Sequence, residues 1–398
     1  MTRPGLPPAD DRASLFAVRG RLVLDRDLVP GAVVVRDGRI VDVLRGPARE
    51  LPATVHEAEV VSAGFIDLQV NGGFGVEVGD SPQAIPHLAA RLPATGVTAF
   101  LPTLVSSAPE VYPRACEAFL ASRDAPGALP LGLHLEGPFI SLHRLGAHRA
   151  SAIRNAPPDL FDPFLDADVL RLVTLAPEME GGLDRIHRLC AHHVVVSLGH
   201  TDASYEQLVQ GIDAGATMAT HIYSAMSGFH HRAPGALGAA LLDDRLVVGL
   251  IADGIHSHPA SIRLALRAKR PDRVALVTDA IAGAGMPPGV YSLDGQDVVV
   301  DSTAAKLRDG TLAGSVLALD QAVRNVVDWT GTGVAEACRM ASEVPARLLG
   351  LRTKGRLAAG FDADLVLLDD GLHVRATFRE GRLLYSRAPA AASTITGR

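Results

Sequence analysis

The stretch Val194-Val-Val-Ser-Leu-Gly-His200 decides the fold, because a continuous apolar run leads directly to a polar side chain. Continuous runs of this kind are typical of parallel strands that are buried on both faces. The same unit, an apolar run followed by a helical stretch, recurs through the middle of the chain, with further runs at residues 64–69, 97–101, 131–135, 170–175, 216–220, 246–251 and 274–277. Eight such units predict an α/β fold, a (β/α)₈ barrel of the TIM type.

An open, doubly wound sheet is the competing architecture for alternating strands and helices. Such folds often carry a glycine-rich phosphate fingerprint after the first strand. Here the nearest candidate is Asn71-Gly72-Gly73, which lacks the required spacing. The sequence therefore favours the barrel.

Both ends of the chain differ from this middle region and are rich in short strands. Strand-like segments lie at residues 15–24, 32–35, 39–44, 364–368, 374–378 and 382–385, with Asp37-Gly38 as a hairpin turn. We expect one small β-sandwich domain formed by residues 1–60 and 355–398, around a barrel that spans residues 61–354. We expect residues 1–12 and 388–398 to be poorly ordered ends.

Composition indicates a soluble, intracellular protein. The chain has 38 basic and 44 acidic residues and a formal net charge of −6, which argues against a nucleic-acid or anionic-membrane partner. No apolar run reaches membrane-spanning length, and no signal peptide is visible. The three cysteines, Cys116, Cys190 and Cys338, are widely spaced and are expected to be reduced. We expect a cytoplasmic location.

Polar side chains follow most of the predicted barrel strands. In a barrel these positions meet at the carboxyl-terminal mouth, where barrel enzymes carry their chemistry. Glu136, His200 and His221 supply one carboxylate and two imidazoles, a ligand set for Zn²⁺ or a similar divalent ion that leaves a position for water. Asp279 is the remaining carboxylate best suited to move a proton to and from that water. A single histidine at a strand end is more often structural, but six of the eight predicted strands end in an acid or an imidazole.

Several motifs together resemble the N-acetylglucosamine-6-phosphate deacetylases of the amidohydrolase superfamily, over nearly the whole chain. They are Ala63-Gly-Phe-Ile-Asp67, His134-Leu-Glu-Gly-Pro-Phe139, Leu198-Gly-His200, Ala219-Thr-His221, Ile251-Ala-Asp-Gly-Ile-His256, Val277-Thr-Asp-Ala280 and Leu312-Ala-Gly-Ser315. The resemblance implies a barrel inserted in a two-ended β-sandwich, usually a homodimer, that acts on an amino-sugar phosphate. It implies that Glu136, His200 and His221 bind the metal and that Asp279 is both base and acid.

The resemblance also assigns substrate contacts. His148 matches a histidine near the acyl group, which adds it to Asp279 as a catalytic candidate, and His256 matches another substrate-contacting histidine. The phosphate region is matched by Arg232, Ser224 and Ala225, and the Leu312–Ser315 motif adds Leu312 and Gly314. One position departs from the pattern, because Ser224 stands where the family usually has asparagine. A shifted preference, for example towards N-acetylgalactosamine 6-phosphate, is therefore an open alternative.

The sequence favours one metal ion per subunit. Many superfamily members open with His-x-His on the first strand, whereas this chain has Gln69-Val70-Asn71, and neutral amides are poor transition-metal ligands. No lysine precedes Lys269, so a carboxylated lysine on the fourth strand cannot bridge two ions. Zn²⁺ is the first candidate, and Fe²⁺, Mn²⁺ and Co²⁺ accept the same ligands. A deaminase and a non-catalytic sugar-phosphate sensor are the functional rivals; the first generally needs the missing His-x-His, and the second needs no base.

Overall fold

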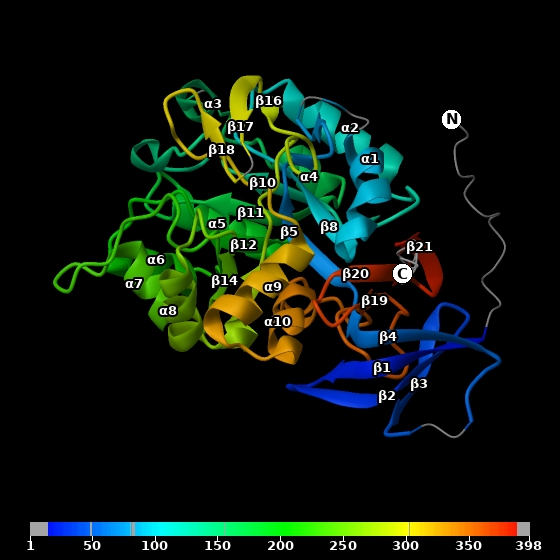
Figure 1. The fold of residues 1–398 in the computed structure, drawn as a ribbon. Coiled ribbons are helices and arrows are strands. Elements are labelled where there is room, and N and C mark those ends of the chain that lie inside the picture. Colours follow the sequence, from blue (N-terminus) through cyan, green and yellow to red (C-terminus); the bar gives the residue numbers. More distant parts are fainter. Residues whose placement is uncertain are drawn as a thin grey trace, which may run out of the picture.

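Parallel strands run side by side through the centre of the molecule, with helices around them (Figure 1). In pairing order they are β5 (Phe65–Val70), β8 (Val97–Leu104), β10 (Leu133–Glu136), β11 (Leu170–Leu175), β12 (Val195–Leu198), β13 (Met218–Ala219), β14 (Val247–Leu250) and β15 (Val274–Leu276). Each falls on one of the predicted apolar runs. A parallel bridge between Val70 and Ala280 links the first strand to the segment after the last and nearly closes the ring. The predicted barrel is confirmed, and the open sheet is excluded.

The structure is a computed structural model that describes residues 15–47, 50–79, 81, 84–154, 156–301 and 303–387. The predicted poorly ordered ends, residues 1–12 and 388–398, lie outside these ranges. The helices are α1 (Ala84–Arg91), α2 (Val111–Ser122), α3 (Ala150–Arg154), α4 (Asp162–Asp166), α5 (Gly182–Ala191), α6 (Tyr205–Asp213), α7 (Gly235–Leu242), α8 (Pro259–Lys269), α9 (Leu319–Thr330), α10 (Val334–Ala341) and α11 (Glu343–Leu348), with 3₁₀ turns η1 (Leu92–Thr95), η2 (Leu142–Arg144) and η3 (Pro271–Arg273). None of these described helices is both long enough and apolar enough to cross a membrane.

Local sequence explains why these elements form. Every residue of β8 is buried, so its continuous apolar run suits a strand covered on both faces. Helix α6 begins at a capping box, in which Ser204 Oγ accepts the Gln207 N–H and Gln207 Oε1 accepts the Ser204 N–H. This reciprocal pair satisfies two backbone donors that the first helical turn leaves unpaired.

Strands from both ends of the chain form a second sheet beside the barrel, blue and red in Figure 1. Its order, among the described residues, is β21 (Arg382–Ser386), β20 (Val374–Arg379), β19 (Leu365–Leu368), β4 (Thr54–Ala63), β1 (Phe16–Leu24), β2 (Asp27–Arg36) and β3 (Arg39–Arg45). It has its own hydrophobic core, which includes Phe16, Ile40 and Phe378. The expected small sheet domain built from both termini is confirmed. The boundary at residues 60/61 falls inside β4 and, like the boundary at 354/355, stays a prediction.

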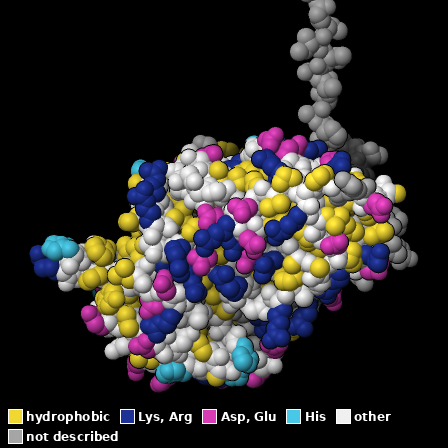
Figure 2. Space-filling model, turned by 90° about the horizontal axis from the view of Figure 1, so that it is seen from below, with side chains coloured by type: hydrophobic (Ala, Val, Ile, Leu, Met, Phe, Trp, Pro, Cys, Tyr) yellow, Lys and Arg dark blue, Asp and Glu magenta, His cyan; other side chains and the backbone are white. Residues whose placement is uncertain are grey.

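A buried ion pair lies in the segment that leads from the barrel back into this sheet. Lys354 Nζ contacts Asp362 Oδ2 at 2.8 Å and Asp364 Oδ2 at 2.7 Å, and all three side chains are less than a tenth exposed. The outer surface is different: on the face shown in Figure 2, Lys and Arg side chains lie among Asp and Glu side chains.

A small antiparallel sheet above the barrel was not predicted. It consists of β16 (Gly289–Leu293), β17 (Gln296–Val300) and β18 (Ala305–Leu307), and Leu293 and Val298 pack against Val105 and Ile281 of the barrel mouth. Short pairs β6 (Gly72–Gly73) with β7 (Val76–Glu77), and β9 (Leu129–Pro130) with β8, complete the described strands. The small sheet thus forms one wall of the site.

Candidate active site

A cavity of about 410 Å³ opens at the carboxyl ends of the barrel strands. Its lining includes most of the predicted site residues: Glu136, His148, His200, His221, Ser224, Ala225, His256, Asp279, Leu312 and Gly314. The strands therefore bring together positions that are up to 178 residues apart in the chain, from Glu136 to Gly314. Such a cavity, with convergent polar groups at the mouth of a barrel, is the usual place for a ligand.

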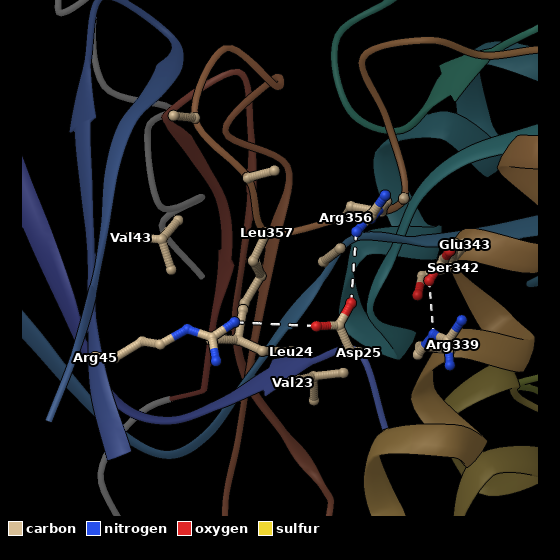
Figure 3. A pocket seen from close by; sticks show the side chains of 14 residues that line it. Val23, Leu24, Asp25, Val43, Arg45, Arg339, Ser342, Glu343, Arg356 and Leu357 are labelled. Atoms are coloured by element: carbon tan, nitrogen blue, oxygen red, sulfur yellow. Dashed lines mark hydrogen bonds and ion pairs between the residues drawn. The ribbon is translucent and has the colours of Figure 1, made fainter. Parts of the chain in front are cut away.

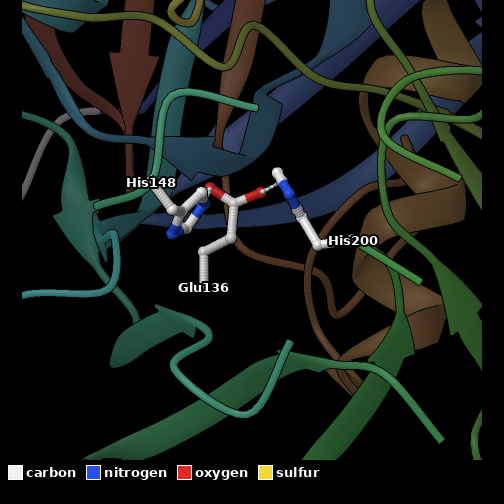
Figure 4. Close-up of side chains that lie close together, drawn as sticks. All are labelled: Glu136, His148 and His200. Atoms are coloured by element: carbon white, nitrogen blue, oxygen red, sulfur yellow. Dashed lines mark ion pairs between the residues drawn. The ribbon is translucent and has the colours of Figure 1, made fainter. Parts of the chain in front are cut away.

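A carboxylate surrounded by imidazoles lies at the floor of this cavity. Glu136 ends β10, and its Oε1 lies 2.9 Å from His221 Nε2 and 3.3 Å from His200 Nε2, while those two nitrogens are 3.2 Å apart. His148 Nε2 lies 3.8 Å from Glu136 Oε2. Figure 4 shows His148 and His200 on opposite sides of the Glu136 carboxylate. We call Glu136, His148, His200 and His221 the carboxylate–imidazole cluster.

Hydrogen bonds on the far ring nitrogens distinguish the histidines. His200 Nδ1 lies 2.8 Å from the Arg144 carbonyl oxygen and must donate to it, so Nε2 carries a lone pair. His148 Nδ1 accepts the Ser106 backbone N–H at 3.1 Å, so a neutral ring carries its proton on Nε2. His200 is thus arranged as a ligand and His148 as a hydrogen-bond donor. Atoms of Glu136, His148 and His200 all lie within 4.8 Å of one another, but we prefer His221 to His148 as a ligand for this reason.

The cluster fits a divalent cation. The Nε2 lone pair of His200, Nε2 of His221 and a carboxylate oxygen converge within 3.3 Å, an arrangement that needs a positive charge among them. Although burial by itself raises the pKa of Glu136, the neighbouring imidazoles of His200 and His221 hold that pKa well below its usual range. Burial lowers the pKa of His148 to about 3, so this ring is neutral.

Asp279 stands next to the cluster and is held by amides of the first strand. Its Oδ1 accepts hydrogen bonds from Gln69 Nε2 at 3.0 Å and Asn71 Nδ2 at 2.6 Å. Gln69 Nε2 also donates to Glu136 Oε1 at 3.0 Å. Burial, and then the nearby charge of Glu136, raise the pKa of Asp279. A carboxylate with a raised pKa is suited to accept and return a proton near neutrality.

Three of these residues have left-handed backbone conformations. The φ angles are +47° at His200, +24° at His221 and +52° at Asp279. Such angles are uncommon for residues other than glycine, and they concentrate at functional sites. They turn the chain sharply beyond β12, β13 and β15, where the side chains meet the cavity.

His256, which also lines the cavity, is held by an acidic neighbour. Its Nδ1 lies 2.7 Å from Asp253 Oδ2, while Asp253 Oδ1 accepts the backbone N–H groups of Ile255 and His256 at 2.8 Å each. Nδ1 therefore carries a hydrogen, and Nε2 is the atom available to a ligand.

Arg232 is the predicted site residue that the structure does not bring into the cavity. It is exposed on the loop between His221 and α7, which extends away from the barrel in Figure 1. Its Nη1 lies 2.9 Å from His231 Nε2. Its role in phosphate binding stays a prediction.

A second cavity, of about 310 Å³, lies between the terminal sheet and helices α10 and α11 (Figure 3). Acidic groups accompany its arginines: Asp25 lies 3.5 Å from Arg356 and 3.9 Å from Arg45, and Glu343 bonds Arg339 at 2.6 Å. No histidine is among its lining residues, all of which are described. It therefore lacks the ligand set found at the barrel mouth.

Comparison with known proteins agrees with this geometry. The model of the amidohydrolase family matches residues 60–384. The chain belongs to the amidohydrolase family. This amidohydrolase is 41% identical over 389 residues to N-acetylglucosamine-6-phosphate deacetylase of Bos taurus, covering 92% of this chain and 93% of the relative. It is 40% identical over 361 residues to N-acetylgalactosamine-6-phosphate deacetylase of Escherichia coli O157:H7, covering 87% and 93%.

A solved structure extends the likeness of this amidohydrolase to the whole fold. A mutant N-acetyl-D-glucosamine-6-phosphate deacetylase of Mycobacterium smegmatis, in complex with N-acetyl-D-glucosamine-6-phosphate, superposes with a TM-score of 0.89 at 34% identity. The match covers 94% of this chain and all of that chain. The predicted family is therefore confirmed.

Reasoning from the sequence of this amidohydrolase missed the residues that support the cluster. Ser106, Arg144, Gln69 and Asn71 orient the predicted groups through the contacts described above. Only the alternation of Gln69 and Asn71 on the first strand signalled that both side chains face the same side. The contacts of Ser106 and Arg144 depend on loop geometry, which has no periodicity in the sequence.

Proposed function

We propose that this amidohydrolase removes the acetyl group from N-acetyl-D-glucosamine 6-phosphate and releases acetate and D-glucosamine 6-phosphate. The observation that carries the proposal is the meeting of Glu136, His200, His221 and Asp279 in one cavity of a chain with deacetylase relatives. The protein then serves amino-sugar catabolism or cell-wall recycling in the cytoplasm, with no nucleic-acid or membrane partner.

Glu136, His200 and His221 hold one divalent ion in this proposal, with Zn²⁺ as the first candidate and Fe²⁺, Mn²⁺ or Co²⁺ as alternatives. A cation bound there would lower the pKa of a water molecule and polarise the acetyl carbonyl. His148 is left out of the ligand set because its Nε2 carries the proton.

The chain's own residues then perform the proton transfers. Asp279 takes a proton from the water that attacks the acetyl carbon. His148 Nε2–H donates to the acetyl oxygen as negative charge develops there, which stabilises the transition state. Asp279 returns its proton to the sugar nitrogen as the C–N bond breaks, so acetate and the amino sugar leave. Burial of both groups keeps competing water away from the proton transfer.

A panel of N-acetylated hexosamine phosphates, assayed for acetate release, tests this function. We expect turnover of the 6-phosphate, loss of turnover with a chelator and recovery on adding metal. Tight binding without acetate release by metal-replete protein would instead support the sugar-phosphate sensor, and ammonia release would support a deaminase.

Galactosamine is the second candidate sugar, for two reasons. Ser224 lines the cavity where the family usually has asparagine, and one relative at 40% identity is an N-acetylgalactosamine-6-phosphate deacetylase. The ratio of kcat/KM for the two sugar phosphates decides between them. A Ser224→Asn variant tests whether this position sets the ratio.

A homodimer is also part of the proposal. Phe229 and Leu242, on the loop that carries Arg232 and on helix α7, are 59% and 65% exposed. Large apolar side chains at such exposure suit burial against a second copy. Arg232 lies outside its own cavity, so a second copy could receive it.

Subunit mixing tests this arrangement. Arg232→Ala and Asp279→Asn subunits are each expected to be inactive alone. If Arg232 acts on the neighbouring site, their mixture regains activity, because the Asp279→Asn subunit supplies Arg232 to the other copy. Light scattering that finds a monomer would contradict the dimer.

A further inference from the structure

The side chain of Gln69 touches both carboxylates of the site. Its single amide nitrogen lies 3.0 Å from Glu136 Oε1 and 3.0 Å from Asp279 Oδ1. An amide nitrogen carries two hydrogens, one for each acceptor, and they diverge by about 120°, which sets the two oxygens roughly 5 Å apart. Gln69 is 1% exposed, so no water competes for these bonds.

Asn71 adds a second donor to the same oxygen of Asp279. Its Nδ2 lies 2.6 Å from Asp279 Oδ1, and none of the described residues donates to Oδ2. Oδ1 is thus occupied by two N–H groups, while the other oxygen is available to a reacting group. Two donors on one oxygen also fix the rotation of the carboxylate.

The orientation of Asn71 has a cost. Because Nδ2 faces a carboxylate, Asn71 Oδ1 points elsewhere, and this buried atom has no hydrogen-bond partner among the described residues. An unpaired buried acceptor destabilises a fold by about 1–3 kcal/mol. Stability alone therefore does not account for an asparagine here, whereas a need for its donor does.

We propose that Gln69 and Asn71 are positioning residues that act through Asp279: their amides hold its Oδ1, so that Oδ2 is the oxygen that takes the proton from water and returns it to the amine. Gln69 in addition keeps Asp279 at a fixed distance from Glu136, which prevents the base from joining the ligand set. This inference rests on the proposed function for its rate measurements. Neutral amides suit the task because a charged donor would hold the proton-accepting carboxylate in an ion pair.

A double-mutant cycle tests the proposal. The backbone bond from Asp279 N–H to the Gln69 carbonyl, at 3.0 Å, does not depend on the side chain, so Gln69→Ala removes the amide alone. We expect Gln69→Ala to lower kcat roughly thirtyfold to a hundredfold, the scale of a small misplacement of a reacting group. KM should change less than about threefold and metal content per subunit should not change. In an Asp279→Asn background, Gln69→Ala should lower kcat by less than about threefold, because the residue through which it acts is already changed.

Asn71→Ala separates positioning from folding. It should lower kcat about tenfold, while the unfolding midpoint stays the same or rises, since the unpaired oxygen is removed. Gln321→Ala, which deletes an amide on α9 that bonds Asn325, serves as the matched control with unchanged kcat.

Two results would overturn the proposal. One is a double variant whose loss of kcat equals the product of the losses in Gln69→Ala and Asp279→Asn. The other is a loss of metal from Gln69→Ala in proportion to its loss of activity. A crystal structure of Gln69→Ala gives an answer independent of turnover, because Asp279 should then leave its present rotamer. If wild type releases no acetate from any sugar phosphate, the proposed function fails. An unchanged rotamer of Asp279 in the Gln69→Ala crystal structure would, independently of that result, contradict the positioning role.

Discussion

At the scale of single residues, a change at Asp279 should lower the rate of the reaction without changing the metal content of the protein. Replacing it by asparagine keeps the shape but removes the proton acceptor. We expect Asp279→Asn to lower kcat by about 10²–10⁴-fold, the usual worth of a positioned acid–base group. Metal content per subunit, measured by elemental analysis, should stay as in wild type. Asp328→Asn, at an exposed position, is the control; loss of metal from Asp279→Asn would make Asp279 a ligand instead.

Asp67 gives a residue-scale prediction about pH. It is fully buried beneath the site, where Thr278 donates to it, and burial raises its pKa to about 7. The folded state therefore binds a proton that the unfolded state releases near pH 4, so this group's stabilising contribution is lost as pH rises from about 4 to 7. Over that range the unfolding free energy of Asp67→Asn should rise by up to about 4 kcal/mol relative to that of wild type, because the pKa of Asp67 differs by roughly three between the folded and unfolded states. Denaturant unfolding at pH 5 and pH 8 measures it, and parallel pH slopes would contradict it.

At the scale of elements, the small sheet β16–β18 holds the loop that carries His148. Asp294 at the hairpin turn bonds Arg149 Nε at 2.6 Å, and Gln296 Nε2 donates to the Ala147 carbonyl at 2.8 Å. Arg149→Ala should release this loop and lower kcat/KM roughly ten- to a hundredfold. Arg308→Ala, which breaks an exposed ion pair with Asp297 on the same sheet, should leave kcat/KM unchanged. Equal losses in both variants would show that the sheet acts only through stability.

The elements also show what the sequence could reveal. All eight apolar runs correspond to barrel strands, because burial on both faces of a strand requires a continuous run of apolar residues. This holds even for β13, which is only Met218–Ala219. The meeting of Glu136, His200, His221 and Asp279 in one cavity could be predicted because strand ends meet at one mouth, and their roles stay predictions. The sheet β16–β18 was missed because it follows the last barrel strand and adds no unit to the repeat. The bonds of Gln69 were missed because they depend on how the first and last strands meet.

At the scale of the whole molecule, Lys354 pairs with Asp362 and Asp364 inside the segment that leads from the barrel into the terminal sheet. Lys354→Met leaves the buried carboxylate of Asp364 without a counter-charge, while Asp362 keeps its ion pair with Arg39, and we expect a loss of about 3–5 kcal/mol in unfolding free energy. Denaturant titration measures this, with Lys306→Met on the exposed surface as the control. Similar midpoints for the two variants would show that the pair adds nothing to the junction.

The bridge between Val70 and Ala280 has a consequence for how the protein becomes an enzyme. Gln69 and Asp279 meet there although 210 positions separate them along the chain. The ribosome must therefore release the eighth strand before Asp279 can contact Gln69. Contacts between residues so far apart in the chain form slowly. A complete site thus requires that the ring has closed, and a nascent chain that stops short of this bridge has Glu136, His200 and His221 but lacks Asp279.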